Sequence, residues 1–253
     1  MEISSYLSRI NFKSPILLNH ETLCGLHRAH MLAVPFENFD IVPLQHQIQL
    51  NRQALWDKII VRRRGGFCYE LNGLFAWLLE EIGFEVTYLN GRVYNRDGKR
   101  GRNFDHLTLQ VGIPNRSDRW LADVGFGDSF LEPLVFNNAK DQIQALRAYR
   151  LEHVEDGLDM LQRDYAGIWK RQYFFDLQPQ KFPDDYEETC LFHQTSPLST
   201  FTRGSVISIA TGDGRITLDD NHLIVTKNGL REERLISSKE KPKLLMEYFD
   251  VIL

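Results

Sequence analysis

The segment of residues 68–83 constrains the fold of this chain more than any other. Apolar side chains recur along it at intervals of three and four residues, which is the spacing of one face of an α-helix. They are Leu71, Leu74, Phe75, Leu78, Leu79 and Ile82. Gly83 follows directly, and glycine commonly ends helices because it adopts the left-handed conformation without a Cβ clash. The sequence therefore predicts a helix over residues 68–82 that packs its apolar face in a core.

The apolar period changes from helical to alternating after Gly83. Strands are predicted at residues 84–89, 92–94, 106–113 and 119–124, with turns at 95–98 and 115–118. Helical patterns precede this region at residues 22–32 and 52–62. Beyond it lie further strand patterns at 149–154, 205–209, 215–218 and 222–226, and a helical pattern at 241–248. Helices, then antiparallel strands, then a smaller mixed segment form an α+β order, so a parallel dinucleotide-binding sheet is not expected.

Composition excludes several classes of protein. The 253 residues carry 30 Lys and Arg against 34 Asp and Glu, a net charge of −4, which argues against a basic nucleic-acid-binding protein. The longest apolar stretch, residues 74–84, is interrupted by Glu80 and Glu81 and is too short to span a bilayer. The N-terminus lacks the basic and apolar regions of a secretion signal. We expect a cytoplasmic protein without membrane or nucleic-acid partners.

Neither the cysteines nor the histidines form a metal-binding pattern. Cys24, Cys68 and Cys190 are an odd number and widely spaced, which excludes a disulfide framework and a cysteine zinc site. His27 and His30 are three residues apart on a predicted helix, but no acidic residue recurs with them at metal-binding spacing. A core or surface role is expected for both histidines, and no metal site is predicted.

Cys68 stands where the strongest predicted helix begins. Unpaired backbone N–H groups and the positive end of the helix dipole face this position and favour a thiolate. Gly65 and Gly66 precede it and permit a tight entry of the backbone. The alternative is a small core residue, because position 68 is in phase with Leu71 and Phe75. Cys68 is therefore a candidate nucleophile.

A nucleophilic cysteine needs a base, and the base needs an orienting group. His106 opens a predicted strand on its polar face, and Asp123 ends the next strand. A hairpin about residues 114–118 would place the two side chains opposite or diagonal on one face of the sheet. The structural alternatives are a hydrogen-bonded polar histidine and an aspartate that forms a turn. The three residues are consistent with a Cys–His–Asp triad, in the chain order of papain-like and transglutaminase-like enzymes.

Several sequence blocks resemble the arylamine N-acetyltransferase family. They are residues 34–39 (VPFENF), 64–72 (RGGFCYELN), 105–109 (DHLTL), 121–127 (LADVGFG) and 194–201 (QTSPLSTF). The resemblance implies an α+β fold with a cysteine-protease-like, or transglutaminase-like, core. It divides the chain into an N-terminal helical bundle at 1–83 with the nucleophile, a β-barrel at 84–185 with the histidine and aspartate, and a C-terminal α/β lid at 186–253.

The resemblance also implies a reaction. Cys68 would accept an acetyl group from acetyl-CoA, with His106 as its base and Asp123 as the orienting carboxylate. An arylamine, arylhydrazine or N-hydroxyarylamine would then take the acetyl group in the second half of a ping-pong cycle. Acetyl-CoA would be a co-substrate, and no permanently bound cofactor is implied. The sequence leaves open the natural acceptor, the oligomeric state and whether xenobiotic metabolism is the physiological role.

Further residues take roles by the same resemblance. Positions of the apolar acceptor pocket are Phe36, Val93 and Phe126. The loop along the pantetheine and pyrophosphate of coenzyme A is formed by Gly125, Phe126 and Gly127. A buried network that supports the turn before the nucleophile is expected to contain Glu37, Asn38 and Arg64.

Other functions fit the same residues. An amide synthase of this fold that closes a polyketide chain would use the same triad, and a protease or transglutaminase would need a peptide-sized groove. A binding module with a vestigial triad would leave Cys68 unreactive. Two departures from the family pattern bear on coenzyme A binding: Asp105 stands where other members carry Thr or Ser, and the chain ends early, at Leu253.

Overall fold

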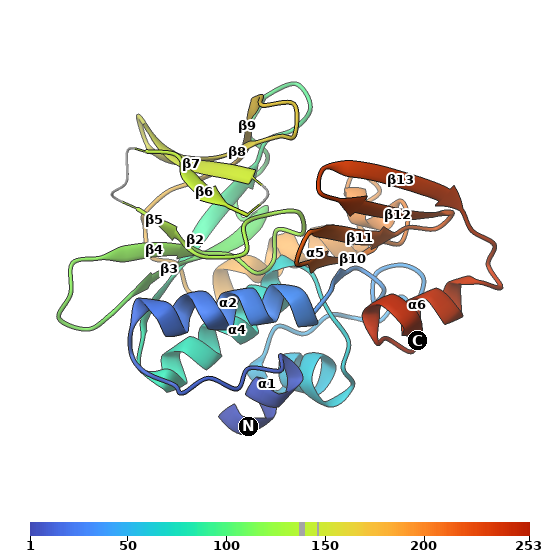
Figure 1. Cartoon of the computed structure of the whole chain (residues 1–253), viewed down its shortest axis with the longest axis horizontal. Helices are drawn as coiled ribbons and strands as arrows, with labels where there is room; N and C mark the ends of the chain where they lie inside the picture. Colours follow the sequence, from blue (N-terminus) through green and yellow to red (C-terminus); the bar gives the residue numbers. More distant parts are fainter. Residues whose placement is uncertain (137–139, 146) are drawn as a thin grey trace.

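Helices form the first third of the chain and lie beneath two antiparallel sheets (Figure 1). The computed structural model describes residues 1–136, 140–145 and 147–253. The elements of the first third are α1 (Ile3–Arg9), α2 (His20–Ala33), β1 (Phe36–Glu37), α3 (Arg52–Trp56), a π-helical turn (Asp57–Val61) and α4 (Cys68–Ile82). The predicted helix at 52–62 is thus a short α-helix continued by a π-helical turn.

Helix α4 forms the centre of the main core, and its predicted bounds are confirmed. Glu70 in its first turn accepts a hydrogen bond from the backbone N–H of Phe67 at 3.1 Å, which satisfies one of the free donors of the helix start. Gly83 ends the helix at φ +108°. The helix packs against the larger sheet, and Phe75 also contacts the rings of His27 and His30 on α2. The nucleophile candidate therefore lies at the start of a rigid, buried element.

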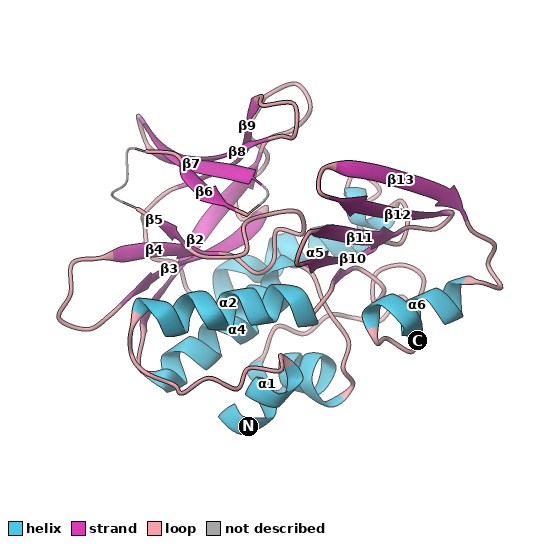
Figure 2. Cartoon of the chain, in the orientation of Figure 1, coloured by secondary structure: helices cyan, strands magenta, loops and turns pink. Residues whose placement is uncertain are grey.

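The larger sheet is antiparallel and runs in the order β5-β4-β3-β2-β9-β8-β7-β6 (Figure 2). Its strands are β2 (Glu85–Val93), β3 (His106–Gly112), β4 (Arg119–Ala122), β5 (Leu134–Val135), β6 (Gln142–Gln144), β7 (Arg147–Val154), β8 (Gly157–Arg163) and β9 (Trp169–Phe175). Its two edge strands lie close together. The Gln142 amide on β6 accepts a hydrogen bond from the Val135 N–H on β5 at 2.7 Å and donates one to the Val135 carbonyl at 3.0 Å. The sheet is therefore a nearly closed barrel.

The smaller sheet runs in the order β1-β10-β11-β12-β13. The C-terminal elements are α5 (Glu187–Thr195), flanked by 3₁₀ turns at Asp184–Tyr186 and Thr200–Thr202, then β10 (Ile207–Thr211), β11 (Gly214–Leu218), β12 (His222–Lys227), β13 (Leu230–Leu235) and α6 (Lys241–Phe249). β1 comes from the helical part and pairs with β10, where Phe36 lies opposite Ser208. This pairing attaches the C-terminal sheet to the segment before the nucleophile.

The α+β prediction is confirmed, with differences in the strands. The strands predicted at 84–89 and 92–94 form one strand, β2, because Asn90 and Gly91 stay paired with Leu107 and His106 of β3. No strands were predicted at 157–163 and 169–175, where β8 and β9 complete the barrel. Asp159 in β8 and Lys170 and Arg171 in β9 interrupt the apolar alternation there, and the pairing of the two strands shifts register between Met160 and Leu161. In the described parts of the chain, no helix is both long and apolar enough to cross a membrane.

Gly73 is the point at which α4 approaches Phe182 most closely, and we expect Gly73→Ala to destabilise the fold. A Cβ at this position would lie 2.5 Å from the Phe182 ring, which stacks on Tyr88 and has little room to move. We expect a loss of about 1–3 kcal/mol in unfolding free energy from overpacking, although alanine favours helices. Denaturant unfolding measures it, with Gly212→Ala as control, because a Cβ at Gly212 would meet no atom within 4 Å. Equal stability of the two variants would contradict the expectation.

Candidate active site

Cys68 is the first residue of α4 and is buried, with 3% of its surface exposed. The backbone of Gly125 lies against it, since a Cβ on Gly125 would be 2.7 Å from the Cys68 Cα. Only glycine permits this approach, which brings the loop after β4 onto the first turn of α4. The thiol is thus held between a helix N-terminus and the barrel.

His106 and Asp123 meet on neighbouring strands. The register of β3 and β4 pairs Leu109 with Ala122 and, continued beyond the ladder, places His106 diagonal to Asp123. The His106 Nε2 lies 2.7 Å from Asp123 Oδ2, and both side chains are buried. The charge of the His106 ring also interacts with the Cys68 side chain. Because Nε2 is engaged by Asp123, the nitrogen that faces Cys68 is Nδ1.

The other oxygen of Asp123 is also occupied. Oδ1 accepts hydrogen bonds from the Asn72 amide at 2.9 Å and from the Gly125 N–H at 3.0 Å. Asn72 lies four residues after Cys68 and therefore on the same face of α4. Its amide also donates to the Leu107 carbonyl and accepts from the Val124 N–H, at 2.6 and 2.9 Å. The helix that carries the nucleophile thus also fixes the carboxylate.

His27 has a positioning contact that its helical spacing did not reveal. Its Nε2 accepts a hydrogen bond from the backbone N–H of Asp123 at 3.0 Å, and its Nδ1 donates to the Leu131 carbonyl at 2.8 Å. Burial lowers the pKa of His27 to about 4, so the ring is neutral at pH 7. The structure brings His27 to the site as a support of the Asp123 backbone, which matches the expected core role.

The electrostatics favour a charged His106–Asp123 pair. Burial alone lowers the pKa of His106, but the charge of Asp123 and the hydrogen bonds to Asp123 and Cys68 outweigh it and raise the pKa to about 10. Burial likewise raises the pKa of Asp123, and here too the opposing interactions, chiefly with His106, prevail and lower it. The Tyr173 hydroxyl is buried beside Asp123 and Thr108 but lacks a hydrogen bond of good geometry. The electrostatics therefore favour an imidazolium at His106.

A second set of buried charges lies under the turn that precedes Cys68. Arg64 contacts Glu37 at 2.8 Å and Asp40 at 3.3 Å. Lys58 contacts Asp40 at 2.8 Å and Glu70 at 2.7 Å, and Glu70 also caps the start of α4. Burial alone lowers the pKa of Lys58, but the neighbouring carboxylates outweigh it and raise the pKa. The cluster fixes the chain on both sides of the two glycines.

The sequence also assigned Asn38 to this cluster, but its side chain contacts a different segment of the chain. The Asn38 amide instead donates to the carbonyls of Phe201 and Gly204 at 2.9 Å and accepts from the Val206 N–H at 2.7 Å. Neighbouring residues in extended backbone point to opposite sides, so Glu37 and Asn38 face different partners. Lys58, Asp40 and Glu70 were missed because their contacts join segments that no local pattern relates.

The aromatic candidates lie around the triad. The Phe126 ring packs against His106 and Tyr173, with ring centroids 5.2 and 5.0 Å apart. Val93 ends β2 and packs with Phe126 on the same apolar cluster. Phe36 lies on β1, and its ring is 6.1 Å from that of Phe201. Phe126 and Val93 therefore share an apolar cluster beside His106, and Phe36 lies on the far side of the loop 125–127 near Phe201.

The loop after β4 joins the triad to the aromatic residues. Gly127 adopts φ +84°, which favours glycine, and a Cβ there would lie 3.8 Å from the Phe36 ring. Beyond it, Asp128 contacts Arg147 at 2.9 Å and Arg215 at 3.3 Å. The loop 125–127 thus runs from Cys68 to Phe36, and Asp128 ties its end to both sheets.

Comparison with known proteins identifies the family. Residues 19–253 match the family model described as N-acetyltransferase. Arylamine N-acetyltransferase 1 from Homo sapiens is 34% identical over 280 residues, which span 100% of this chain and 95% of that protein. The chain belongs to the arylamine N-acetyltransferase family. The arylamine N-acetyltransferase of Escherichia coli K12 is 34% identical over 90% of this chain and 80% of its own.

Solved structures of family members share the fold. The arylamine N-acetyltransferase of Mycobacterium marinum superposes with a TM-score of 0.92 at 31% identity, covering 99% of this chain and 93% of that one. A structure of the same enzyme in complex with CoA gives a TM-score of 0.91 over the same shares. The predicted transglutaminase-like core is thereby confirmed.

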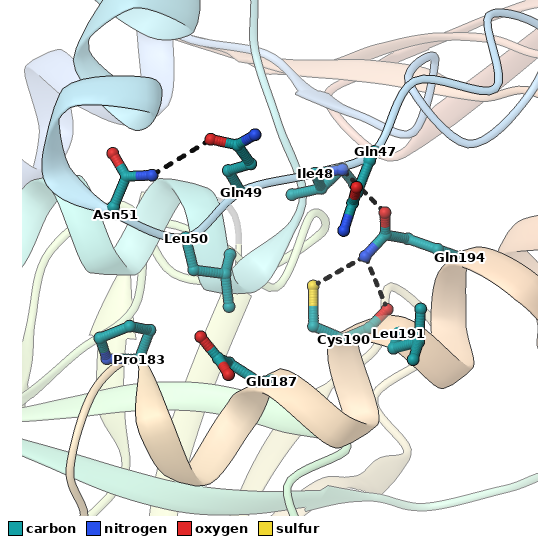
Figure 3. A pocket seen from close by; sticks show the side chains of 10 residues that line it. All are labelled: Gln47, Ile48, Gln49, Leu50, Asn51, Pro183, Glu187, Cys190, Leu191 and Gln194. Atoms are coloured by element: carbon teal, nitrogen blue, oxygen red, sulfur yellow. Dashed lines mark hydrogen bonds between the residues drawn. The ribbon is translucent and has the colours of Figure 1, made fainter.

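The lining of the cavity shown in Figure 3 does not include Cys68, His106 or Asp123. The cavity has a volume of about 410 Å³ and lies between residues 47–51 and α5. Cys190 lines it and accepts a hydrogen bond from the Gln194 amide at 3.3 Å, and burial raises the pKa of this thiol. Within the described ranges, no group of three or more His, Cys, Asp and Glu is arranged to hold a metal ion.

We expect His106 to remain an imidazolium at pH 8 in the free protein. The pKa of His106 in the folded protein lies above the ordinary histidine value of about 6.5. The charged pair therefore stabilises the fold fully below a pH of about 6.5, and this stabilisation is lost as the pH rises through about 10. In Asp123→Asn the carboxylate charge is removed, so burial should lower the pKa of His106 and leave the ring neutral at pH 7.5. Nitrogen-15 NMR of the imidazole measures both, with the exposed Asp118→Asn as control. A neutral ring at pH 7.5 in the unmodified protein would refute this assignment.

We expect Lys58→Met to destabilise the fold by about 3–5 kcal/mol, because it leaves Asp40 and Glu70 without their shared cation in a buried site. Lys170→Met is the matched control, since Lys170 pairs with Asp164 at the surface and should contribute less than about 1 kcal/mol. Chemical denaturation of both variants measures the difference. A cost for Lys58→Met as small as that of the control would show that the cluster does not hold the turn.

Proposed function

We propose that this protein transfers an acetyl group from acetyl-CoA to arylamines, arylhydrazines or N-hydroxyarylamines through a thioester on Cys68. The observation that carries the proposal is the continuous contact of Cys68, His106 and Asp123 at the N-terminus of α4. Membership of the arylamine N-acetyltransferase family supports it, as does the CoA complex of the Mycobacterium marinum relative. Coenzyme A and a small aromatic amine or hydrazine are the proposed partners.

In the first half-reaction, the Cys68 thiolate attacks the acetyl carbonyl of acetyl-CoA. The carbon–sulfur bond to coenzyme A breaks, and the departing thiolate takes a proton from the His106 imidazolium. The raised pKa of His106 suits this role, because the proton is present at neutral pH. Asp123 holds the ring in the orientation that directs Nδ1 toward sulfur. The product is acetyl-Cys68 with a neutral His106.

In the second half-reaction, the acceptor nitrogen attacks the thioester. An aromatic amine is largely neutral at pH 7, so its lone pair is available without prior deprotonation. The neutral His106 takes the proton that the nitrogen loses, and the Cys68 thiolate leaves. This restores the starting charges, so one histidine serves as acid in the first step and as base in the second.

We further propose the surroundings in which these steps occur. Phe36, Val93 and Phe126 form the apolar acceptor pocket, and the contact of Phe126 with the His106 ring and its shared cluster with Val93 support this role. The loop 125–127 follows the pantetheine and pyrophosphate. We divide the chain into three parts, with boundaries after residues 83 and 185. The first part carries Cys68, the second carries His106 and Asp123, and the third is the lid. We assign the protein to the cytoplasm, consistent with free thiols at its three cysteines.

We expect intact protein mixed with acetyl-CoA, without amine, to gain the mass of one acetyl group. Cys68→Ser should not gain it, because a hydroxyl is a far weaker nucleophile at neutral pH. Cys24→Ser is the matched control and should keep the adduct, since burial and Glu132 raise the pKa of Cys24 to about 11. An aromatic amine should then remove the group, as mass spectrometry would show. An adduct that persists in Cys68→Ser, or none in the unmodified protein, would overturn the proposal.

A further inference from the structure

A second histidine–carboxylate contact lies beside the nucleophile and has no part in the transfer described above. His193 Nε2 lies 3.4 Å from Asp105 Oδ1. The His193 ring is buried, and its Nδ1 lies 3.2 Å from the Ser199 hydroxyl. Its Nε2 has no hydrogen bond of good geometry. The ring is therefore oriented by Ser199 and directed at the carboxylate that precedes the catalytic candidate His106.

The position of His193 places this contact at the site. Its ring packs on Phe67 at 6.5 Å and on Tyr69 at 6.1 Å, the two residues that flank Cys68. It also meets Phe201 at 5.2 Å, and Phe201 in turn contacts Phe36 of the proposed acceptor pocket. The imidazole thus lies between the turn of the nucleophile and the acceptor side of the triad.

Asp105 reaches the same region from the barrel. Its Oδ2 lies toward Gly101, where a Cβ would be 2.5 Å from this oxygen and 2.8 Å from the Val93 carbonyl. Val93 is another residue of the proposed acceptor pocket. The carboxylate therefore sits between Val93 on β2 and His193 on α5, and the glycine at 101 provides its space.

The backbone before Asp105 is held in one conformation. Phe104 adopts φ +58°, a strained value for a bulky residue. Its N–H donates to Asn90 Oδ1 at 2.6 Å, and its carbonyl accepts from the Tyr69 hydroxyl at 2.5 Å. The preceding Arg102 guanidinium lies 3.6 Å over the Phe192 ring of α5. These contacts keep the Asp105 carboxylate in place.

The carboxylate of Asp105 has unused hydrogen-bonding capacity. Its side chain is 20% exposed, and among the described residues no donor forms a hydrogen bond of good geometry with it. A largely dehydrated carboxylate gains most from a donor or cation that replaces the lost water. A bound substrate that carries a donor or a cation would supply one.

We propose that Asp105, oriented by His193, determines which acceptors the enzyme prefers. It favours aromatic amines and hydrazines that carry a cationic or hydrogen-bond-donating substituent, and it disfavours those that carry a carboxylate. This inference rests on the proposed acetyl transfer and adds the chemical class of its acceptor. The triad supplies the reaction, and Asp105 supplies the charge selection.

The test compares three acceptors that differ in charge: 4-aminobenzamidine, aniline and 4-aminobenzoate. Their intrinsic reactivities differ, so the measured quantity is the change in the ratio of kcat/KM between variant and unmodified protein. In Asp105→Asn, we expect the benzamidine-to-benzoate ratio to fall by about tenfold or more. The value for aniline should change by less than about twofold. Asp97→Asn, at an exposed turn, is the matched control and should leave the ratio unchanged.

A second variant and a measurement on the unmodified protein ensure that the result does not depend on the folding of one variant. Asp105→Thr removes the charge with a different side chain and should lower the ratio as Asp105→Asn does. In the unmodified protein, added salt should reduce the benzamidine-to-benzoate ratio, because it screens the charge of Asp105. An unchanged ratio in the variants, or an equal loss for all three acceptors, would overturn the proposal. Acetylation of Cys68 without an acceptor is measured separately, so a failure of the transfer reaction itself is distinguished.

Discussion

A buried negative charge must be paired on every side, and Asp123 meets this requirement through partners from three different parts of the chain. His106 comes from β3, Asn72 from α4 and the Gly125 N–H from the loop after β4. None of these segments can move without leaving the carboxylate unpaired. The relative position of helix and barrel, and hence of thiol and imidazole, follows from the hydrogen bonds of this one side chain.

A second cluster of buried charges, at the first turn of α4, must also be paired within the protein. Glu70 caps the helix and needs a cation, which Lys58 provides, and Lys58 in turn contacts Asp40. The two charge clusters hold the short stretch that presents Cys68: Arg64 precedes the thiol, and Glu70 and Asn72 follow it. The stretch between them contains Gly65 and Gly66, whose backbone would otherwise be free to vary. The position of the thiol is therefore set from both sides by charge pairing rather than by apolar packing alone.

The sequence predicted those features that depend on local periodicity and on one tight hairpin. The helix at 68–82 and the diagonal placement of His106 and Asp123 follow from spacing alone, because a short turn leaves few registers open. Asn72 and His27 could not be assigned roles in this way, since their partners lie 51 and 96 residues away in the chain. The partners of Asn38 could not be predicted from its place beside Glu37, because neighbouring side chains in extended backbone point to opposite faces.

Two aspartates near the thiol show how environment separates the roles of one residue type. Asp123 has no exposed surface and three close hydrogen-bond partners, so its charge is fully used within the protein and serves to orient His106. Asp105 lies next to His106 in the sequence, but it keeps some exposure, and its only ion pair within the described part of the chain is with His193, at 3.4 Å. A charge compensated inside the fold cannot discriminate between substrates, whereas one left partly uncompensated can. The degree of internal pairing therefore separates the carboxylate proposed to orient His106 from the one proposed to select the acceptor.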